Sequence, residues 1–139
     1  MNFTPYLLLK GNCAEAMQFY HTIFGGELKL MTVSDTPMQN QLSAEQQEKI
    51  INARLKSDII DISASDWLHP TRTPQQGNTV CLYLSGGTYE NLKEYFDKLA
   101  VGADPQTLDP LTDRFYGTYG ALTDKFGIRW MFQGDSKNK

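Results

Sequence analysis

The stretch Asn12–Gly26, NCAEAMQFYHTIFGG, decides the fold because it carries a complete helix signal from start to stop. Asn12 is a favourable N-cap residue, and Glu15, three positions later, is placed to complete a capping box. Gly25 and Gly26 end the helix, since glycine readily adopts the left-handed conformation that terminates helices. Between these signals, apolar residues recur at the i, i+3, i+4, i+7 spacing of one helical face: Ala16, Phe19, Tyr20 and Ile23.

A second stretch repeats this pattern later in the chain. Tyr89–Gly102, YENLKEYFDKLAVG, again places apolar residues on one helical face and again ends on glycine. A shift of 76 residues carries Phe19 onto Tyr95 and Gly26 onto Gly102. Two copies are too few for a solenoid, which needs at least three stacked repeats, so the chain fits a fold of two paired modules better. The same shift superposes the apolar runs that precede the helices, Pro5–Leu8 and Cys81–Leu84.

Short apolar or alternating runs around the two helices predict the strands. In the first module these are Phe3–Lys10, Glu27–Val33, Asn52–Lys56 and Ile59–Ser63, and in the second they are Thr79–Ser85, Arg114–Leu122 and Ile128–Phe132. We therefore predict an α+β fold of two paired βαβββ modules, residues 1–68 and 78–134, in one compact domain with a linker at 69–77. The polar segment Ser34–Lys49 is either an exposed loop or a working lid.

Composition excludes several classes of function. The chain has 139 residues and a net charge of −3 without a basic stripe, which argues against nucleic-acid binding. No apolar run approaches the roughly 18–20 residues of a membrane span, and the first residues lack the basic segment and long apolar core expected of a secretory signal. The two cysteines, Cys13 and Cys81, lack the spacing of metal or redox motifs. We expect a soluble cytoplasmic protein.

Two segments carry a resemblance to a known family: PYLLLKGNCAEAMQFY at the start and YGALTDKFGIRWMF near the end. They resemble the vicinal oxygen chelate superfamily, which includes glyoxalases, bleomycin-resistance proteins and extradiol dioxygenases. The closer likeness is to its PhnB-like branch, the demethylubiquinone methyltransferase-like domain. The resemblance implies that the modules pair their sheets into a cup-shaped mixed sheet. It also implies a homodimer, because family members usually share or complete their cups between chains.

The resemblance further implies a divalent metal held by His, Gln or Glu side chains of the cup. In this chain the four ligand positions fall on Pro5, near Asp61, on Cys81 and on Met131. Asp61 alone is a hard ligand and Cys81 a soft one, whereas a catalytic site needs about three or four N or O ligands. We therefore predict no cofactor and no metal, with Asp61 as a weak metal candidate.

Strand alternation and residue chemistry select the candidate cup residues. Asp61 is either an acid that binds a polar substrate group or a rim residue paired with Arg54 or Lys56 across the hairpin. Arg54, Arg114 and Arg129 are candidates for anion recognition, although an ordinary surface arginine is the default for Arg114. The aromatic run with Phe115, Tyr116 and Tyr119 suits either a flat apolar ligand or strand packing at a dimer contact. Trp67 and Met38 are candidates to cover the cup mouth. The full candidate list is Leu7, Leu9, Arg54, Asp61, Cys81, Tyr83, Phe115, Tyr119, Arg129 and Met131.

The predicted function is metal-free binding of a small, partly apolar molecule in the cup, in the manner of bleomycin-resistance proteins. The alternative is a metal-dependent lyase, isomerase or dioxygenase of the glyoxalase type. A metal-free enzyme that uses Asp61 or a Cys81 nucleophile is a weaker third hypothesis, because no His lies near Cys81 in the sequence.

Overall fold

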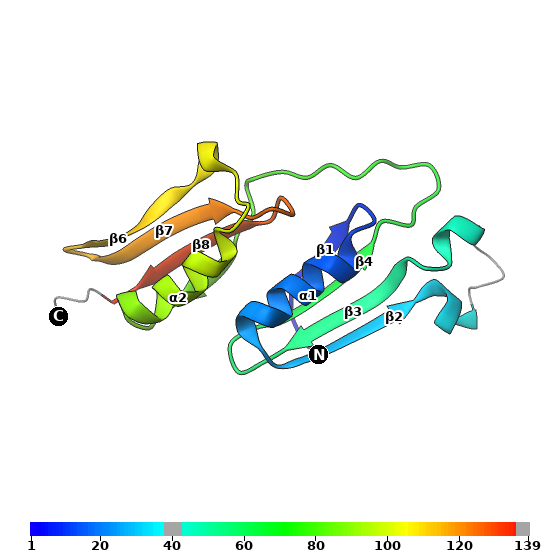
Figure 1. Ribbon diagram of the computed structural model, residues 1–139, viewed down its shortest axis with the longest axis horizontal. Coiled ribbons are helices and arrows are strands. Elements are labelled where there is room, and N and C mark those ends of the chain that lie inside the picture. The colour runs from blue at the N-terminus through cyan, green and yellow to red at the C-terminus, as the bar shows by residue number, and fades with distance from the viewer. Residues whose placement is uncertain (38–42, 136–139) are drawn as a thin grey trace. The chain divides into compact units, whose positions relative to one another are not determined.

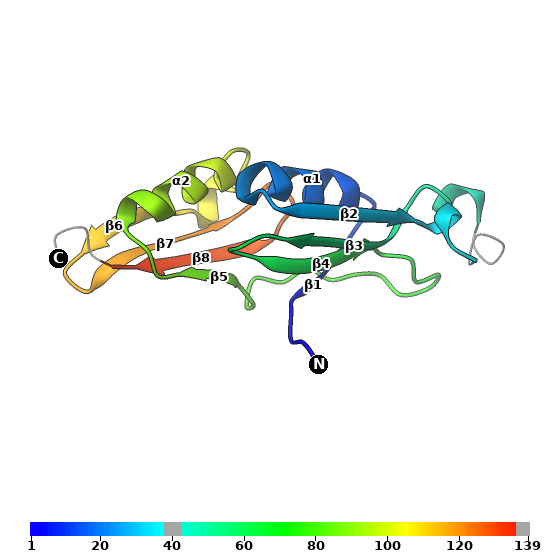
Figure 2. The same ribbon diagram turned by 90° about the horizontal axis from the view of Figure 1, so that it is seen from below.

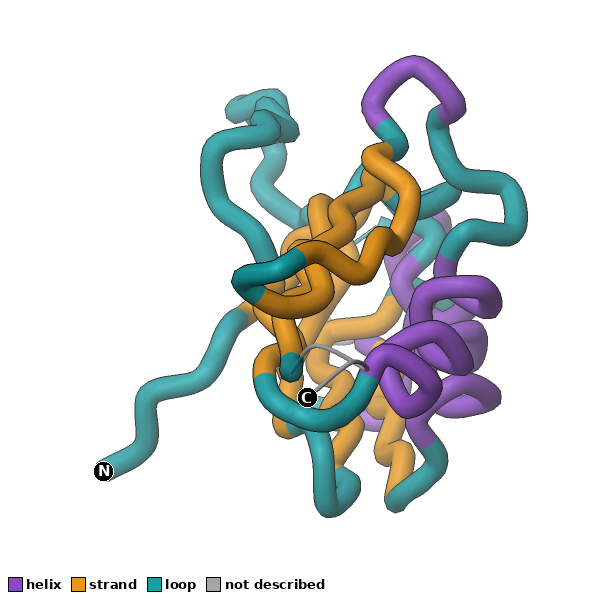
Figure 3. Tube along the Cα trace, turned by 90° about the vertical axis from the view of Figure 1, so that its left-hand side faces the viewer, coloured by secondary structure: helices purple, strands orange, loops and turns teal. Residues whose placement is uncertain are grey.

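The computed structural model describes residues 1–37 and 43–135, and Met38 lies outside them. The chain divides into two compact units, Met1–Gln75 and Gln76–Lys139. The connection between the last strand of the first unit and the first strand of the second, residues 67–81, contains no helix or strand (Figures 1 and 3). No helix in the described ranges is long and apolar enough to cross a membrane.

The first unit is a four-stranded mixed sheet with one long helix, in the strand order β1-β4-β3-β2 (Figure 1). Strands β1 and β4 pair in parallel, and the β4–β3 and β3–β2 pairs are antiparallel. The short 3₁₀ turns η1 (Val33–Asp35) and η3 (Ala44–Gln46) lie between β2 and β3. The strands and the helix are β1 (Tyr6–Leu9), α1 (Cys13–Phe24), β2 (Glu27–Thr32), β3 (Ile50–Lys56) and β4 (Asp61–Asp66).

The core of this unit lies between α1 and one face of the sheet, as the apolar periodicity predicts (Figure 2). Ala16, Tyr20 and Ile23 are buried on the inner side of α1, whereas Phe19 is only half-buried. Met17, which the predicted face omits, is fully buried. The sheet contributes the alternate residues of its strands, with Leu28 opposite Leu55 and Ala53 opposite Ala64.

The start of α1 differs from the sequence prediction. Asn12 makes no side-chain capping bond, and its Oδ1 is buried without a hydrogen-bond partner among the described residues. Instead, Asp66 at the end of β4 accepts a hydrogen bond from the Cys13 N–H through Oδ1 (2.9 Å). Its Oδ2 accepts from the Ile50 N–H (2.8 Å), so one buried carboxylate joins the helix start to two strands.

The end of α1 follows the prediction. The helix stops at Phe24, and Gly25 and Gly26 both have positive φ, +68° and +89°. At Gly26 a Cβ atom would lie 2.3 Å from the Lys56 carbonyl oxygen. Glycine is therefore required there by both backbone conformation and space, and it allows α1 to turn directly into β2.

The second unit repeats the topology of the first, with the strand order β5-β8-β7-β6 and one long helix (Figure 1). β5 and β8 pair in parallel, and the other two pairs are antiparallel. This confirms the α+β class and the duplication predicted from the sequence. The elements are β5 (Leu82–Ser85), α2 (Tyr89–Leu99), the 3₁₀ turn η4 (Pro105–Thr107), β6 (Asp109–Arg114), β7 (Gly117–Thr123) and β8 (Arg129–Gly134).

The predicted single extended stretch Arg114–Leu122 is wrong, because the chain reverses inside it. Arg114 ends β6 and pairs with Gly117, which begins β7, so Phe115 and Tyr116 form the tip of a hairpin. The turn carries two aromatic residues at its centre rather than the Gly, Asn, Asp or Pro that usually mark such a turn. That composition explains why sequence patterns alone do not reveal it.

The core of the second unit lies under α2. Leu92, Phe96 and Leu99 of the helix are buried, and the Phe96 and Phe132 rings meet edge to face at 5.1 Å between centroids. Thr88 caps the helix by accepting from the Asn91 N–H. These contacts fix which face of the sheet is covered and which is left open.

The orientation predicted for the first strand is also wrong. Leu9 is 3% exposed, and both Leu7 and Leu9 lie opposite β4 residues on the α1 side of the sheet, so Tyr6 and Leu8 face the open side instead. In β5 it is Leu84 that faces the helix and Tyr83 that is exposed. The shift of 76 residues therefore superposes the helices but not the strands before them. Leu7 faces α1, whereas its equivalent Tyr83 faces the open side, so the two strands are offset by one residue.

Candidate ligand site on the second sheet

The open face of the second sheet, opposite α2, carries a row of polar and aromatic side chains. Strand register places Tyr119 beside Gln133, Ala121 beside Met131 and Thr123 beside Arg129 across β7 and β8. The alternate residues Gly120 and Leu122 pair with Phe132 and Trp130 of the core. The predictions that Tyr83, Arg129 and Met131 face away from the helix are therefore confirmed.

A β-bulge extends this row onto β6. The register shifts between Asp109, which pairs with Ala121, and Thr112, which pairs with Tyr119. Because of the extra residue, Asp109 and Thr112 lie on the same face although they are three positions apart. Arg114, two residues beyond Thr112, follows on this face at the end of the strand.

A pocket of about 640 Å³ lies along the β6–β7 hairpin. At the tip, Phe115 is 97% exposed, and its ring meets that of Tyr116 edge to face, with 5.1 Å between centroids. Soluble proteins seldom leave large aromatic side chains clustered in water, so this tip is a candidate contact surface. The pocket lining includes Asp109, Thr112, Arg114, Phe115, Tyr116 and Tyr119.

Arg129 lies beside the pocket and is engaged by the protein itself. Its Nη2 pairs with Asp109 Oδ2 (3.3 Å), and its Nη1 donates to the Thr107 carbonyl oxygen and to Thr123 Oγ1. The side chain is only 16% exposed. Arg129 therefore holds η4 and the start of β6 against β8, and it neutralises Asp109.

Tyr83 and Gln133 form a hydrogen-bonded pair on the same face. The Tyr83 hydroxyl donates to Gln133 Oε1 at 2.8 Å, which orients the amide so that its NH₂ group points away from Tyr83. Gln133 is exposed and lies next to Tyr119 in the register. The pair was not singled out from the sequence, and the only sequence signal is the alternation of Arg129, Met131 and Gln133 on one side of the last strand.

In the first unit, Arg54 and Asp61 form an ion pair. This matches the prediction that Asp61 pairs with a basic residue across the hairpin. Arg54 Nε and Nη2 donate to Oδ1 and Oδ2 of Asp61 at 3.0 and 2.8 Å. The hydrogen bond from Arg54 lowers the pKa of Asp61 below its ordinary value, and the same contact raises the pKa of Arg54. Both residues lie on the open face of the first sheet, so their predicted orientation is confirmed.

The remaining sequence candidates are placed as follows. Cys81 is half-buried and precedes β5 rather than lying within it. Met131 pairs in register with Tyr83 and with Ala121. Trp67 donates its Nε1–H to the Arg72 carbonyl oxygen at 2.6 Å, within the connection that follows β4.

The residues at the four metal-ligand positions do not fit a hard divalent ion. Pro5 has no donor side chain, and the Asp61 carboxylate is occupied by the two Arg54 hydrogen bonds. Met131 and Cys81 offer only sulfur, which suits soft metals. Within residues 1–37 and 43–135, no group of three or more His, Cys, Asp or Glu is arranged to hold a metal.

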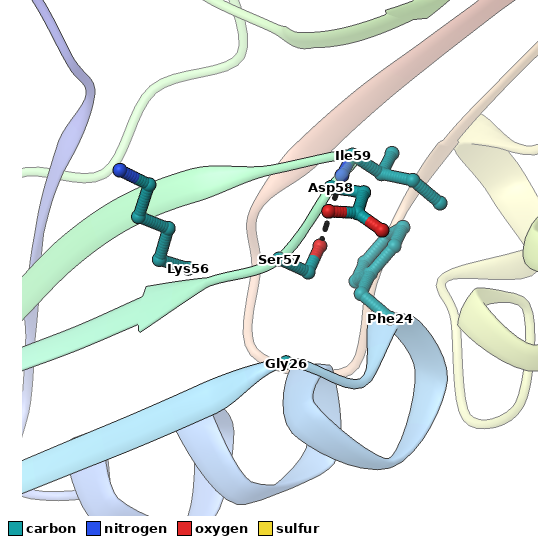
Figure 4. A pocket seen from close by; sticks show the side chains of 6 residues that line it. All are labelled: Phe24, Gly26, Lys56, Ser57, Asp58 and Ile59. Carbon is teal, nitrogen blue, oxygen red and sulfur yellow. Dashed lines mark hydrogen bonds between the residues drawn. The ribbon is translucent and has the colours of Figure 1, made fainter.

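A second hollow, about 390 Å³, lies at the end of α1 in the first unit (Figure 4). Phe24, Gly26, Lys56, Asp58 and the adjacent turn residues line it. The Ser57 hydroxyl accepts from the Ile59 and Ile60 N–H groups at 3.1 and 3.2 Å, so it shapes the β3–β4 turn. A single aromatic residue, Phe24, lines this hollow, whereas Phe115, Tyr116 and Tyr119 line the hairpin pocket, which is therefore the stronger candidate.

Comparison with known proteins identifies the family. Residues 1–133 match the family described as 3-demethylubiquinone-9 3-methyltransferase. The chain belongs to this family. It is 31% identical over 140 residues to Protein YjdN of Escherichia coli, covering 94% of this chain and 93% of YjdN. It is also similar to PA1353 of Pseudomonas aeruginosa, with 30% identity, 99% of each chain covered and a TM-score of 0.83.

Two further solved structures share the fold of this chain. A PhnB protein from Bacillus cereus, described as a putative 3-demethylubiquinone-9 3-methyltransferase, superposes with a TM-score of 0.70 at 20% identity over 96% and 99% of the chains. The fosfomycin resistance protein FosX of Listeria monocytogenes gives 0.63 at 12% identity over 99% and 95%. At these identities the likeness is one of fold, and it confirms the predicted glyoxalase and bleomycin-resistance fold.

Proposed function

We propose that the protein binds a small, partly apolar molecule in the β6–β7 hairpin pocket and that it does so without a metal ion. The main support for this proposal is the pocket of about 640 Å³, whose lining includes Phe115, Tyr116 and Tyr119. Its volume is within the usual range for ligand sites, roughly 300–1,000 Å³. Aromatic walls favour a flat ring as the apolar part of the ligand, since stacked or edge-on ring contacts are favourable there.

The family description supports this choice of ligand class. It refers to 3-demethylubiquinone, whose quinone ring is flat and whose tail is apolar. A ring of that kind matches the aromatic wall of the pocket in shape and polarity. The proposal concerns binding, and it assigns no methyl transfer to this chain.

The metal-free part of the proposal rests on the donor set. A lyase, isomerase or dioxygenase of the glyoxalase type would need about three or four N or O ligands. Asp61 is the one carboxylate at the four positions, and Arg54 already pairs with it. The residues present therefore favour binding over metal-dependent catalysis.

A neutral fluorescent probe tests the binding proposal. N-phenylnaphthylamine is flat, uncharged and bright only in apolar surroundings, so titration of the protein should give a saturable increase in emission. Tyr119→Ala should weaken binding by about tenfold, as expected for loss of one ring contact and its buried area. The matched control is Phe3→Ala, which removes a fully exposed aromatic side chain of the first unit.

Two outcomes would contradict the proposal. One is the absence of saturable binding by the wild-type protein. The other is equal weakening by Tyr119→Ala and Phe3→Ala, since this would mean that the probe coats exposed apolar residues. Far-ultraviolet circular dichroism of each variant checks that the fold is kept.

We also propose a homodimer. Each unit leaves apolar side chains on its open sheet face, with Tyr6 and Leu8 about half-exposed on the first and Tyr83 on the second. A two-fold dimer is the commonest way to cover such surfaces. Sedimentation equilibrium should give about twice the chain mass of 15.7 kDa at micromolar concentration, and a monomer across that range would contradict it.

A further inference from the structure

We propose that the ligand of the hairpin pocket carries an oxyanion, a carboxylate, sulfonate or phosphonate, which is bound by Arg114, the Tyr119 hydroxyl and the Gln133 amide. This inference rests on the proposed binding function and deepens it. The oxyanion is the polar part of the ligand, whereas the aromatic residues of the pocket contact its apolar part.

Two of the three candidate arginines are already paired within the protein. Arg54 is held by Asp61, and Arg129 is held by Asp109 and by η4. Arg114 is exposed, and its guanidinium makes no hydrogen bond or ion pair with the described residues. A guanidinium offers five N–H donors in a planar fork that matches carboxylate and related oxyanions. Arg114 is therefore the arginine of the three that is left to bind a ligand.

The Gln133 amide is oriented by its hydrogen bond with Tyr83. Its Oε1 accepts from the Tyr83 hydroxyl, so the group left to meet a ligand is the NH₂ donor. The Tyr119 hydroxyl likewise has no partner within the described ranges. The Gln133 NH₂ group and the Tyr119 hydroxyl can therefore both donate, and a ligand that supplies acceptors would satisfy them.

The strand register places the three donors close together. Tyr119 lies directly beside Gln133 on one side and beside Thr112 on the other. Arg114 is the diagonal neighbour of Tyr119, two residues beyond Thr112 on the same face. Diagonal neighbours are roughly 7–8 Å apart, within the reach of an arginine side chain. The three donors therefore lie on three adjacent strands and on the same face of the sheet.

Two acidic residues, Asp109 and Asp113, also line the pocket. The charge of Asp109 is compensated by Arg129 at 3.3 Å. Asp113 also lines the pocket edge, but it pairs in register with Thr118, which pairs with Gly134. A Cβ atom at Gly134 would contact Leu92 of α2, so Gly134 lies on the helix side of the sheet. Its register neighbours Thr118 and Asp113 therefore lie on the helix side too.

A matched pair of probes separates the anion claim from the binding claim. Anilinonaphthalene sulfonate has the ring system of N-phenylnaphthylamine plus one sulfonate. The wild-type protein should bind the sulfonate probe more tightly than the neutral one, and the difference should shrink as salt is added. Arg114→Gln should weaken the sulfonate probe by about tenfold and leave the neutral probe within about twofold.

Three more variants sharpen the test. Gln133→Glu keeps an acceptor for the Tyr83 hydroxyl but replaces the amide donor with a carboxylate, so it should also weaken only the sulfonate probe. Tyr119→Phe keeps the ring and removes the hydroxyl, and it should act in the same direction. Arg72→Gln is the control, because it removes one positive charge from an exposed position in the connection after β4.

The outcomes are distinguishable. If the neutral probe binds but the sulfonate probe binds no better, or if Arg114→Gln and Arg72→Gln have equal effects, the oxyanion inference is wrong and the binding proposal stands. If neither probe binds saturably, the binding proposal itself fails. A loss of the sulfonate preference in Arg114→Gln and Gln133→Glu, with the preference kept in Arg72→Gln, supports the inference.

Discussion

Removal of the Trp130 side chain tests the account of the second unit most severely. Trp130 is 1% exposed, lies between Leu82 and Leu122 in the sheet register, and donates its Nε1–H to Asp124 Oδ2 at 2.8 Å. Truncation of a large buried aromatic residue to alanine costs about 3–5 kcal/mol of unfolding free energy. The hydrogen bond to a charged carboxylate contributes about 1.5–3 kcal/mol of its own.

A pair of variants separates these two contributions. Trp130→Phe keeps most of the apolar volume and loses the hydrogen bond, so it should cost about 2 kcal/mol. Trp130→Ala loses both and should cost on the order of 5 kcal/mol, a large part of the total stability of a small protein. The control is Trp67→Phe, in the half-exposed connection after β4, which should stay within about 1 kcal/mol of wild type.

Urea unfolding followed by circular dichroism measures these differences, at one protein concentration because a dimer makes apparent stability concentration-dependent. The packing argument is wrong if Trp130→Ala unfolds within about 1 kcal/mol of wild type. If Trp130→Phe matches wild type, the hydrogen bond to Asp124 contributes nothing net. Equal losses in Trp130→Phe and Trp67→Phe would also contradict the account.

Three further predictions concern metal content and two side chains. Protein prepared without chelators should contain well below one Zn, Ni, Mn or Fe per chain by elemental analysis; one equivalent that is lost in Asp61→Ala would contradict the donor-set argument. Arg54→Ala should raise the pKa of Asp61 toward its ordinary value in a carbon NMR titration of the carboxyl group. Because that pKa is lowered in the folded state, the pair stabilises the fold above the ordinary pKa, and the contribution is lost as the pH falls through the folded value. Burial and the charge of Asp66 raise the pKa of Cys13 to about 12, so a chromogenic thiol reagent should label only Cys81 quickly; two thiols labelled at equal rates would refute this.

The helices and the duplication could be predicted from the sequence because their signals are local. An apolar face at helical spacing and a terminal glycine are read within a dozen residues, and both occur twice. The open-face positions of Tyr83, Arg129 and Met131 follow from alternation within single strands. These features need no knowledge of distant contacts.

Features that depend on distant residues could not be predicted. Asp66 accepts from the Cys13 N–H at the start of α1, although it lies 53 positions later in the chain. Nothing in the sequence around Asn12 indicates that the Asn12 side chain makes no capping bond. The facing of Leu9 depends on how three connecting residues turn into the helix, and a one-residue difference reverses a strand. The ion pair between Arg129 and Asp109, 20 positions earlier, also cannot be predicted from local patterns. For the same reason the sequence does not show that Arg129 is paired while Arg114 is not.

The central claim, that a small apolar molecule binds the β6–β7 hairpin of the second unit, is tested most directly by NMR. Amide proton and nitrogen shifts of isotope-labelled protein are followed while N-phenylnaphthylamine is added. We predict that saturable shift changes concentrate in residues 109–119 and around Gln133. Shift changes confined to residues 1–75, or no saturable change at all, would contradict it.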